Sequence, residues 1–154
     1  MPQLSKGGKY IFAWSIIQDN GSLTFPPKVV HEYKLKEDNF IYIFSGSKQT
    51  GGFCVTTNRL LSDSKLQNIL TDNPELKDRT LKEGELIPYK GKKYAWIQLK
   101  DHSVYLSETL MTDLKIGTGD KLLSIRSSNI AFTMGLKGVL IDKAISYRGK
   151  IETY

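Results

Sequence analysis

Basic side chains are the main chemically active groups in this sequence, because residues common in catalytic and metal sites are scarce. The 154 residues include 22 lysines and arginines against 16 carboxylates, a formal net charge of +6 at neutral pH. Only four of the basic residues are arginines, and the other 18 are lysines. This balance fits a polyanionic partner held through phosphate contacts. The alternative is a lysine-rich surface that is simply solvated.

Few residues are suited to catalysis or to metal binding. The single cysteine, Cys54, excludes an intrachain disulfide and any site made of several cysteines. It lies in an apolar stretch, where we expect a buried and unreactive thiol. His31 and His102 are expected on exposed polar segments, with no Asp or Cys at motif spacing. We therefore predict no catalytic residue, no metal site and no cofactor, and an enzyme is the least favoured class.

One stretch, residues 45–52, looks at first like a phosphate-binding loop. It reads Ser-Gly-Ser-Lys-Gln-Thr-Gly-Gly. A P-loop needs Lys and then Ser or Thr after its last glycine, whereas Gly52 and Phe53 stand there. We expect a hairpin turn instead.

Two segments of the chain, residues 22–44 and 103–125, align from end to end without a gap. Only Ser22/Ser103 and Lys34/Lys115 are identical. Apolar residues nevertheless match at nine positions: Leu23/Val104, Phe25/Leu106, Val29/Leu110, Val30/Met111, Tyr33/Leu114, Leu35/Ile116, Ile41/Leu122, Tyr42/Leu123 and Phe44/Ile125. The match predicts an internal duplication.

Each half predicts the same order of elements, namely a strand, a turn, a short strand, a short helix and a hairpin. In the first half we expect strands over 10–17, 23–25, 40–44 and 53–56 and a helix over 28–33. In the second half we expect strands over 94–99, 104–106, 121–126 and 130–134 and helices over 108–113 and 138–146. Pro27 suits the first turn of a helix, and Ser107 stands where a helix N-cap would. The pattern indicates a mainly β fold with short helices.

The domain organisation follows from these repeats. Residues 6–57 form the first repeat, 58–91 a partly helical connector, 92–137 the second repeat and 138–154 a C-terminal helix and tail. A connector of this length is uncommon unless it packs or has a function, and it is a candidate surface for a protein partner.

The pattern of strand, turn, Leu-Thr-Phe-Pro-Pro, short helix and polar turn resembles the AbrB/MazE/SpoVT family. Pro26 matches that family's proline, residues 33–35 match its helix end, and residues 37–39 and 117–121 match its polar turn. The resemblance implies a swapped-hairpin β-barrel whose two copies interlock here within one chain as a pseudo-dimer. MraZ has a similar arrangement of two units, but its Asp-x-x-Arg signature is absent from both units here.

The same resemblance implies a DNA-binding transcriptional regulator, with duplex DNA as the partner. The face that the family turns to DNA would carry Lys9, Trp14, Lys28, His31, Lys93, Trp96 and Lys100. The family's arginines are absent from the matching positions, and lysine lacks the bidentate fork that reads guanine. The alternative is therefore a protein-interaction or oligomerisation module, which kept the barrel but lost the arginines that read DNA.

The sequence also predicts where the protein resides. No apolar run reaches the roughly 18 residues that a membrane helix needs, so we expect no membrane partner. The start of the chain lacks a basic and then apolar leader, and one cysteine fits a reducing compartment. We expect a cytoplasmic protein that is either a monomer or a homo-oligomer.

Overall fold

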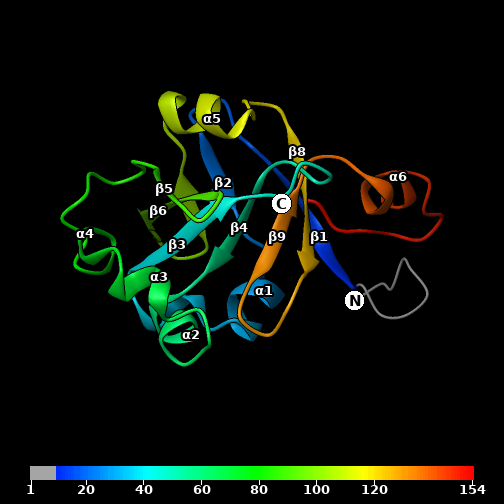
Figure 1. Cartoon of the computed structure of the whole chain (residues 1–154). Helices are drawn as coiled ribbons and strands as arrows, with labels where there is room; N and C mark the ends of the chain where they lie inside the picture. Colours follow the sequence, from blue (N-terminus) through cyan, green and yellow to red (C-terminus); the bar gives the residue numbers. More distant parts are fainter. Residues whose placement is uncertain (1–9) are drawn as a thin grey trace.

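The computed structural model describes residues 10–154, and their fold is mainly β (Figure 1). Seven strands form one antiparallel sheet in the order β1-β8-β9-β4-β3-β6-β5, and β2 pairs with β7 in a second, two-stranded sheet. The strands are β1 (Ile11–Ile16), β2 (Ser22–Thr24), β3 (Phe40–Ser45), β4 (Phe53–Thr56), β5 (Ile87–Tyr89), β6 (Lys92–Gln98), β7 (Ser103–Tyr105), β8 (Lys121–Arg126) and β9 (Phe132–Gly135).

Short helices connect and cover these strands. They are α1 (Pro27–Glu32), the 3-10 helix η1 (Leu35–Glu37), α2 (Asn58–Ser62), α3 (Asn68–Thr71), α4 (Pro74–Lys77), α5 (Glu108–Leu114) and α6 (Val139–Ile145). The predictions of a mainly β fold and of the helices at α1, α5 and α6 are confirmed. No helix within residues 10–154 has the length and apolar character needed to cross a membrane.

Strands from the two halves of the chain pair with each other throughout. The first strand of each half lies beside the third strand of the other, because β1 pairs with β8 and β6 pairs with β3. The short strands β2 and β7 pair with Leu23 opposite Val104, and β4 and β9 pair with Cys54 opposite Thr133. The elements β2, α1 and β3 of the first half also recur in the same order as β7, α5 and β8 of the second.

The main core lies between the large sheet and the helices α1 and α5. Its members come from both halves and include most of the matched apolar residues. Every side chain in the nine matched pairs is buried except that of Phe44, which is partly exposed. Burial of apolar surface of this kind is the dominant stabilising term in folding, so the two halves share one core.

Two smaller clusters cover other parts of the large sheet. The connector, residues 58–91, packs Leu61, Ile69, Leu70 and Leu76 against β3 and β6. Helix α6 and the C-terminal tail cover β1 and β8, where the Trp14 N–H donates to the Glu152 carbonyl at 2.9 Å. The connector, predicted to be partly helical, contains α2, α3 and α4 and also β5, which pairs with β6 and extends the sheet. Strand β5 is only 3 residues long, too short to give a periodic signal.

Candidate nucleic-acid interface

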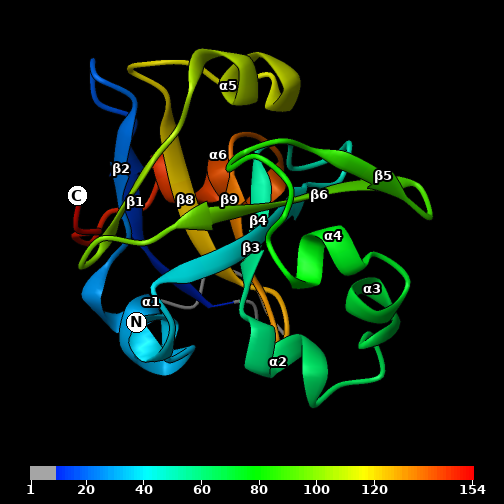
Figure 2. The same cartoon turned by 90° about the vertical axis from the view of Figure 1, so that its left-hand side faces the viewer.

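The two ends of the molecule that carry α1 and α5 are built in the same way. They lie on opposite sides of the molecule in both views (Figures 1 and 2). At the first end, the turn 100–102 of the second half packs on α1, and the Phe25 N–H donates to the His102 carbonyl at 2.8 Å. At the other end, the turn 19–21 of the first half packs on α5, and the Leu106 N–H donates to the Gly21 carbonyl at 2.9 Å.

We call residues 26–39 with 100–102 the basic end. Helix α1 begins at Pro27, whose missing N–H costs nothing in the first turn. The helix ends at Glu32, and shortly after it Lys34 adopts a left-handed conformation with φ of 52°. This reversal leads directly into η1, so the basic side chains of α1 and η1 share one surface.

The basic end carries four lysines and two histidines beside four carboxylates, those of Glu32, Glu37, Asp38 and Asp101. Lys28, His31, Lys34, Lys36 and Lys100 are exposed, and His102 is partly exposed. Four of them, His31, Lys34, Lys36 and His102, line an open hollow of about 580 Å³ beside α1. One carboxylate, that of Glu37, also lines the hollow. The lysines and histidines come from different segments and outnumber it, which suits an anionic partner.

Ion pairs engage most of the carboxylates at the basic end. Glu32 pairs with Arg126, Glu37 with Arg59 at 2.7 Å, and Asp101 with Lys36 at 3.0 Å. The hydrogen bond from Lys36 lowers the pKa of Asp101, and the charges of Lys36 and His102 lower it further. Within residues 10–154, the lysines at 28, 34 and 100 make no ion pair, so their charges remain available to a ligand.

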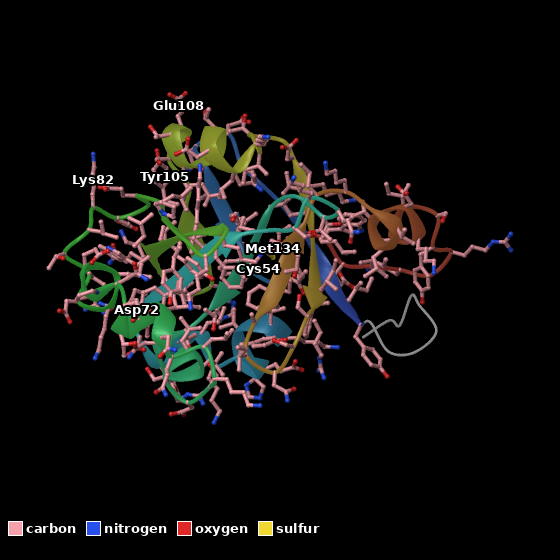
Figure 3. The ribbon with its side chains drawn as sticks, in the orientation of Figure 1. Cys54, Asp72, Lys82, Tyr105, Glu108 and Met134 are labelled. Atoms are coloured by element: carbon pink, nitrogen blue, oxygen red, sulfur yellow. The ribbon has the colours of Figure 1, made fainter. Side chains whose placement is uncertain are left out.

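The opposite end, residues 107–120 with 19–21, has an excess of carboxylates; we call it the acidic end. Helix α5 begins at Glu108, after Ser107, whose hydroxyl accepts the Leu110 N–H as predicted for an N-cap. Carboxylates outnumber lysines here, with Asp19, Glu108, Asp113 and Asp120 against Lys115. Glu108 and the 62% exposed Tyr105 both lie at this side of the molecule (Figure 3). A polyanion is repelled from this end.

The structure brings together only part of the predicted DNA face. Lys28, His31 and Lys100 are exposed and belong to the basic end. Lys93 is also exposed, but it lies near the start of β6, whereas Lys100 follows the end of that strand. Lys9 falls outside the described residues.

Of the two predicted tryptophans, Trp14 is buried and Trp96 is partly buried. Trp14 is only 6% exposed, and the Lys121 ammonium lies 4.6 Å from the centre of its ring. Trp96 packs against the connector, and its Nε1–H donates to the Leu81 carbonyl at 2.8 Å. Large aromatic residues in strands bury most of their area in cores, and we leave both tryptophans out of the candidate interface.

Sequence reasoning missed three members of the basic end, namely Lys34, Lys36 and His102. Their positions follow from the pairing of strands between the two halves, because that pairing places the turn of one half against the helix of the other. No arginine lies within the residues that define the basic end. Arg59 and Arg126 are engaged in ion pairs, and the Arg79 guanidinium lies 3.8 Å from the centre of the Phe40 ring.

Other reactive groups stand apart from the basic end. Cys54 lies in β4, and burial raises the pKa of its thiol, which keeps the thiol protonated at neutral pH. In the described part of the chain, no cluster of three or more His, Cys, Asp or Glu side chains is arranged to hold a metal ion. The glycine-rich stretch forms the turn between β3 and β4, where Gly51 and Gly52 have positive φ.

No family model matches the sequence, and no curated protein matches it either. What the chain does must therefore be inferred from its own residues.

Proposed function

We propose that this protein binds duplex DNA through its basic end, as a transcriptional regulator of AbrB-like type. One observation carries the proposal: within the described residues, Lys28, Lys34 and Lys100 lie exposed without ion-pair partners around α1 and the turn that packs on it. The acidic end carries one lysine, Lys115, among four carboxylates. A net charge of +6 adds a favourable long-range field for a polyanion.

We propose further that the chain is a duplicated swapped-hairpin β-barrel. The exchange of strands between the halves and the recurrence of three elements in the same order support this arrangement. Lys34 and Lys115, which follow α1 and α5, also share a left-handed conformation, with φ of 52° and 59°. Glycine is the usual residue at such a helix end, as in the family that this sequence resembles.

The chemistry of the basic end favours phosphate contacts over base reading. Lysine is a compact point charge on a flexible stem, whereas bidentate recognition of guanine needs an arginine fork. Two arginines from neighbouring segments, Arg59 and Arg126, pair with Glu37 and Glu32 of this end. We therefore propose a complex in which the lysines contact the DNA backbone and in which discrimination between sequences is weak.

The proposal is tested by fluorescence anisotropy of a labelled duplex at several salt concentrations. Three lysine–phosphate contacts predict a slope of log affinity against log salt of about −3. The variant K28Q/K34N/K100Q removes these charges, with Asn at position 34 because Asn tolerates a left-handed backbone. It is expected to bind at least tenfold more weakly and with a slope close to zero.

The matched control is K48Q/K137Q/K143Q, which removes three exposed lysines outside the basic end. It should keep nearly the full slope. Equal losses in the two variants would mean that only net charge matters, and no binding by the unaltered protein at low salt would contradict the proposed function.

A further inference from the structure

A second candidate site, separate from the basic end, lies where the connector covers the large sheet. A cavity of about 470 Å³ opens there, within the usual size range of small-molecule sites. Phe44, Cys54 and Thr133 form its floor on β3, β4 and β9, and Leu66, Tyr94 and Ile130 contribute to its walls. The three walls come from the connector, from the β5–β6 hairpin and from the loop between β8 and β9. Figure 3 shows Cys54 near the centre of the molecule.

The cavity combines an apolar interior with cationic groups. Lys65, Lys90 and Lys92 are among its lining residues, which include no Asp or Glu within the described part of the chain. None of these lysines forms an ion pair within residues 10–154. The Lys92 ammonium donates to the Ser45 carbonyl at 3.4 Å, and that of Lys90 lies 5.3 Å from the centre of the Tyr89 ring.

The Asp72 carboxylate lies close to the wall formed by the β5–β6 hairpin, but it forms an ion pair with none of the three lysines. Asp72 accepts a hydrogen bond from the Tyr89 hydroxyl at 2.6 Å, so it orients that ring. Apolar pockets with a few convergent polar groups are typical of small-ligand sites, and the polar groups select the ligand's charge. Here the available charges are all positive, and the complementary ligand is anionic.

We propose that this cavity binds a small amphipathic carboxylate, whose apolar body lies against Phe44, Tyr94 and Ile130 and whose negative group meets the three lysines. The site does not depend on the proposed DNA binding, since it shares no residue with the basic end. A ligand here contacts the connector and both halves of the chain at once. The function of the connector is then to form one wall of a ligand site.

The test uses decanoate as the anionic probe and decanol as its neutral counterpart, with binding measured by isothermal titration calorimetry. Decanoate is expected to bind at least tenfold more tightly than decanol. Cys54 supplies a second readout, because it is the only cysteine and lies in the floor. Bound decanoate should slow alkylation of Cys54 by N-ethylmaleimide at least threefold, as followed by mass spectrometry of the intact chain.

Two variants separate charge from folding. K65Q/K90N/K92Q should lose at least tenfold in decanoate affinity while decanol binding is unchanged, and K48Q/K137Q/K143Q should match the unaltered protein. Asn is chosen at position 90 because Lys90 has φ of 47°. Leu66 is 48% exposed, so L66D adds a negative charge without disturbing the core, and it should weaken decanoate binding more than L66N does.

Several results would overturn this site. They are no decanoate binding by the unaltered chain, equal affinity for decanoate and decanol, equal losses in the two triple-lysine variants, or no protection of Cys54. The DNA affinity of K65Q/K90N/K92Q is also measured, and it should equal that of K48Q/K137Q/K143Q. The two measurements together distinguish failure of this site from failure of DNA binding.

Discussion

The basic and acidic ends have the same backbone plan but differ in charge. Their helices, α1 and α5, each receive the turn of the other half, and each is followed by a left-handed lysine. Their buried positions match in apolar character, as Val29 and Leu110 illustrate. Most of their exposed positions do not match. Packing therefore fixes where the elements lie, while exposed residues vary freely and determine what each end can bind.

The four lysines and two histidines at the basic end can be compared with their counterparts in the aligned half of the chain. The pairs are Lys28/Thr109, His31/Thr112, Lys34/Lys115, Lys36/Gly117, Lys100/Asp19 and His102/Gly21. Only one pair retains a cation at both ends. This difference is the basis for proposing a DNA surface at one end only.

The largest expected effect concerns the buried core that the two ends share. Leu110 and Val29 are both buried in the main core, so truncation at either end leaves a cavity. L110A should lower the free energy of unfolding by about 3 kcal/mol, and V29A by about 2 kcal/mol because its side chain is smaller. Urea unfolding followed by circular dichroism measures both. No measurable loss at either position would show that the two ends do not share one core.

The next prediction converts the acidic end into a second basic one. D19K/T112K/D113K replaces three exposed residues by lysine at positions that correspond to Lys100, His31 and Glu32. Removing the repulsion and adding phosphate contacts should raise DNA affinity roughly tenfold. Anisotropy titrations check this, with D19N/T112Q/D113N as the control that removes negative charge only. An unchanged affinity in the lysine variant would mean that backbone position does not determine DNA contact.

A smaller effect tests a contact that exists only at the basic end. The Tyr33 hydroxyl donates to the Ser128 carbonyl at 2.8 Å, whereas its counterpart Leu114 has no such group. Y33F should lower the free energy of unfolding by about 1 kcal/mol at neutral pH. Y105F alters an exposed tyrosine at the other end and should cost nothing measurable.

Tyr33 also predicts a difference at alkaline pH. Burial raises the pKa of Tyr33 from 10.0 to about 12, with Glu32 adding to the effect. In the unfolded chain the phenol ionises near 10, so its stabilising contribution is complete below pH 10 and is lost as the pH rises to about 12. The free energy of unfolding, measured across this pH range, should decline less steeply in Y33F than in the unaltered protein. The decline in Y33F is not abolished, because Y33F retains Tyr42, whose pKa is also raised. An identical decline would show that Tyr33 ionises freely in the folded protein.

The smallest expected effect compares the two left-handed lysines. K34G and K115G each relieve an unfavourable backbone conformation, offset by the greater freedom of glycine in the unfolded chain. Each should raise the free energy of unfolding by about 0.5 kcal/mol. Only K34G should also weaken DNA binding, because Lys115 belongs to the acidic end. Equal effects of the two variants on DNA affinity would contradict the distinction between the ends.

Elements with strong local signals could be predicted from the sequence. The turn at 19–21, the proline start of α1, the N-cap at Ser107 and the strand β8 were all predicted, because each depends on residues near in sequence. The site was harder to predict. His102 joins α1 only through pairing between segments that are far apart in the chain, and no local pattern encodes that contact.

The tryptophans and the connector show a second limit. Trp14 and Trp96 lie in strands whose outer faces are covered by α6 with the C-terminal tail and by the connector. Alternation along a strand cannot reveal that both of its faces are covered. The cavity beside the connector is likewise lined by three segments that are far apart in the chain, so no sequence motif predicts it.

The most direct test of the central claim is to add a short duplex to isotopically labelled protein and to follow backbone amide shifts by NMR at low salt. The claim predicts the largest changes within residues 27–37 and 100–102, their reversal at high salt, and little change within 107–120. Changes centred on 107–120, or spread evenly over both ends, would contradict it.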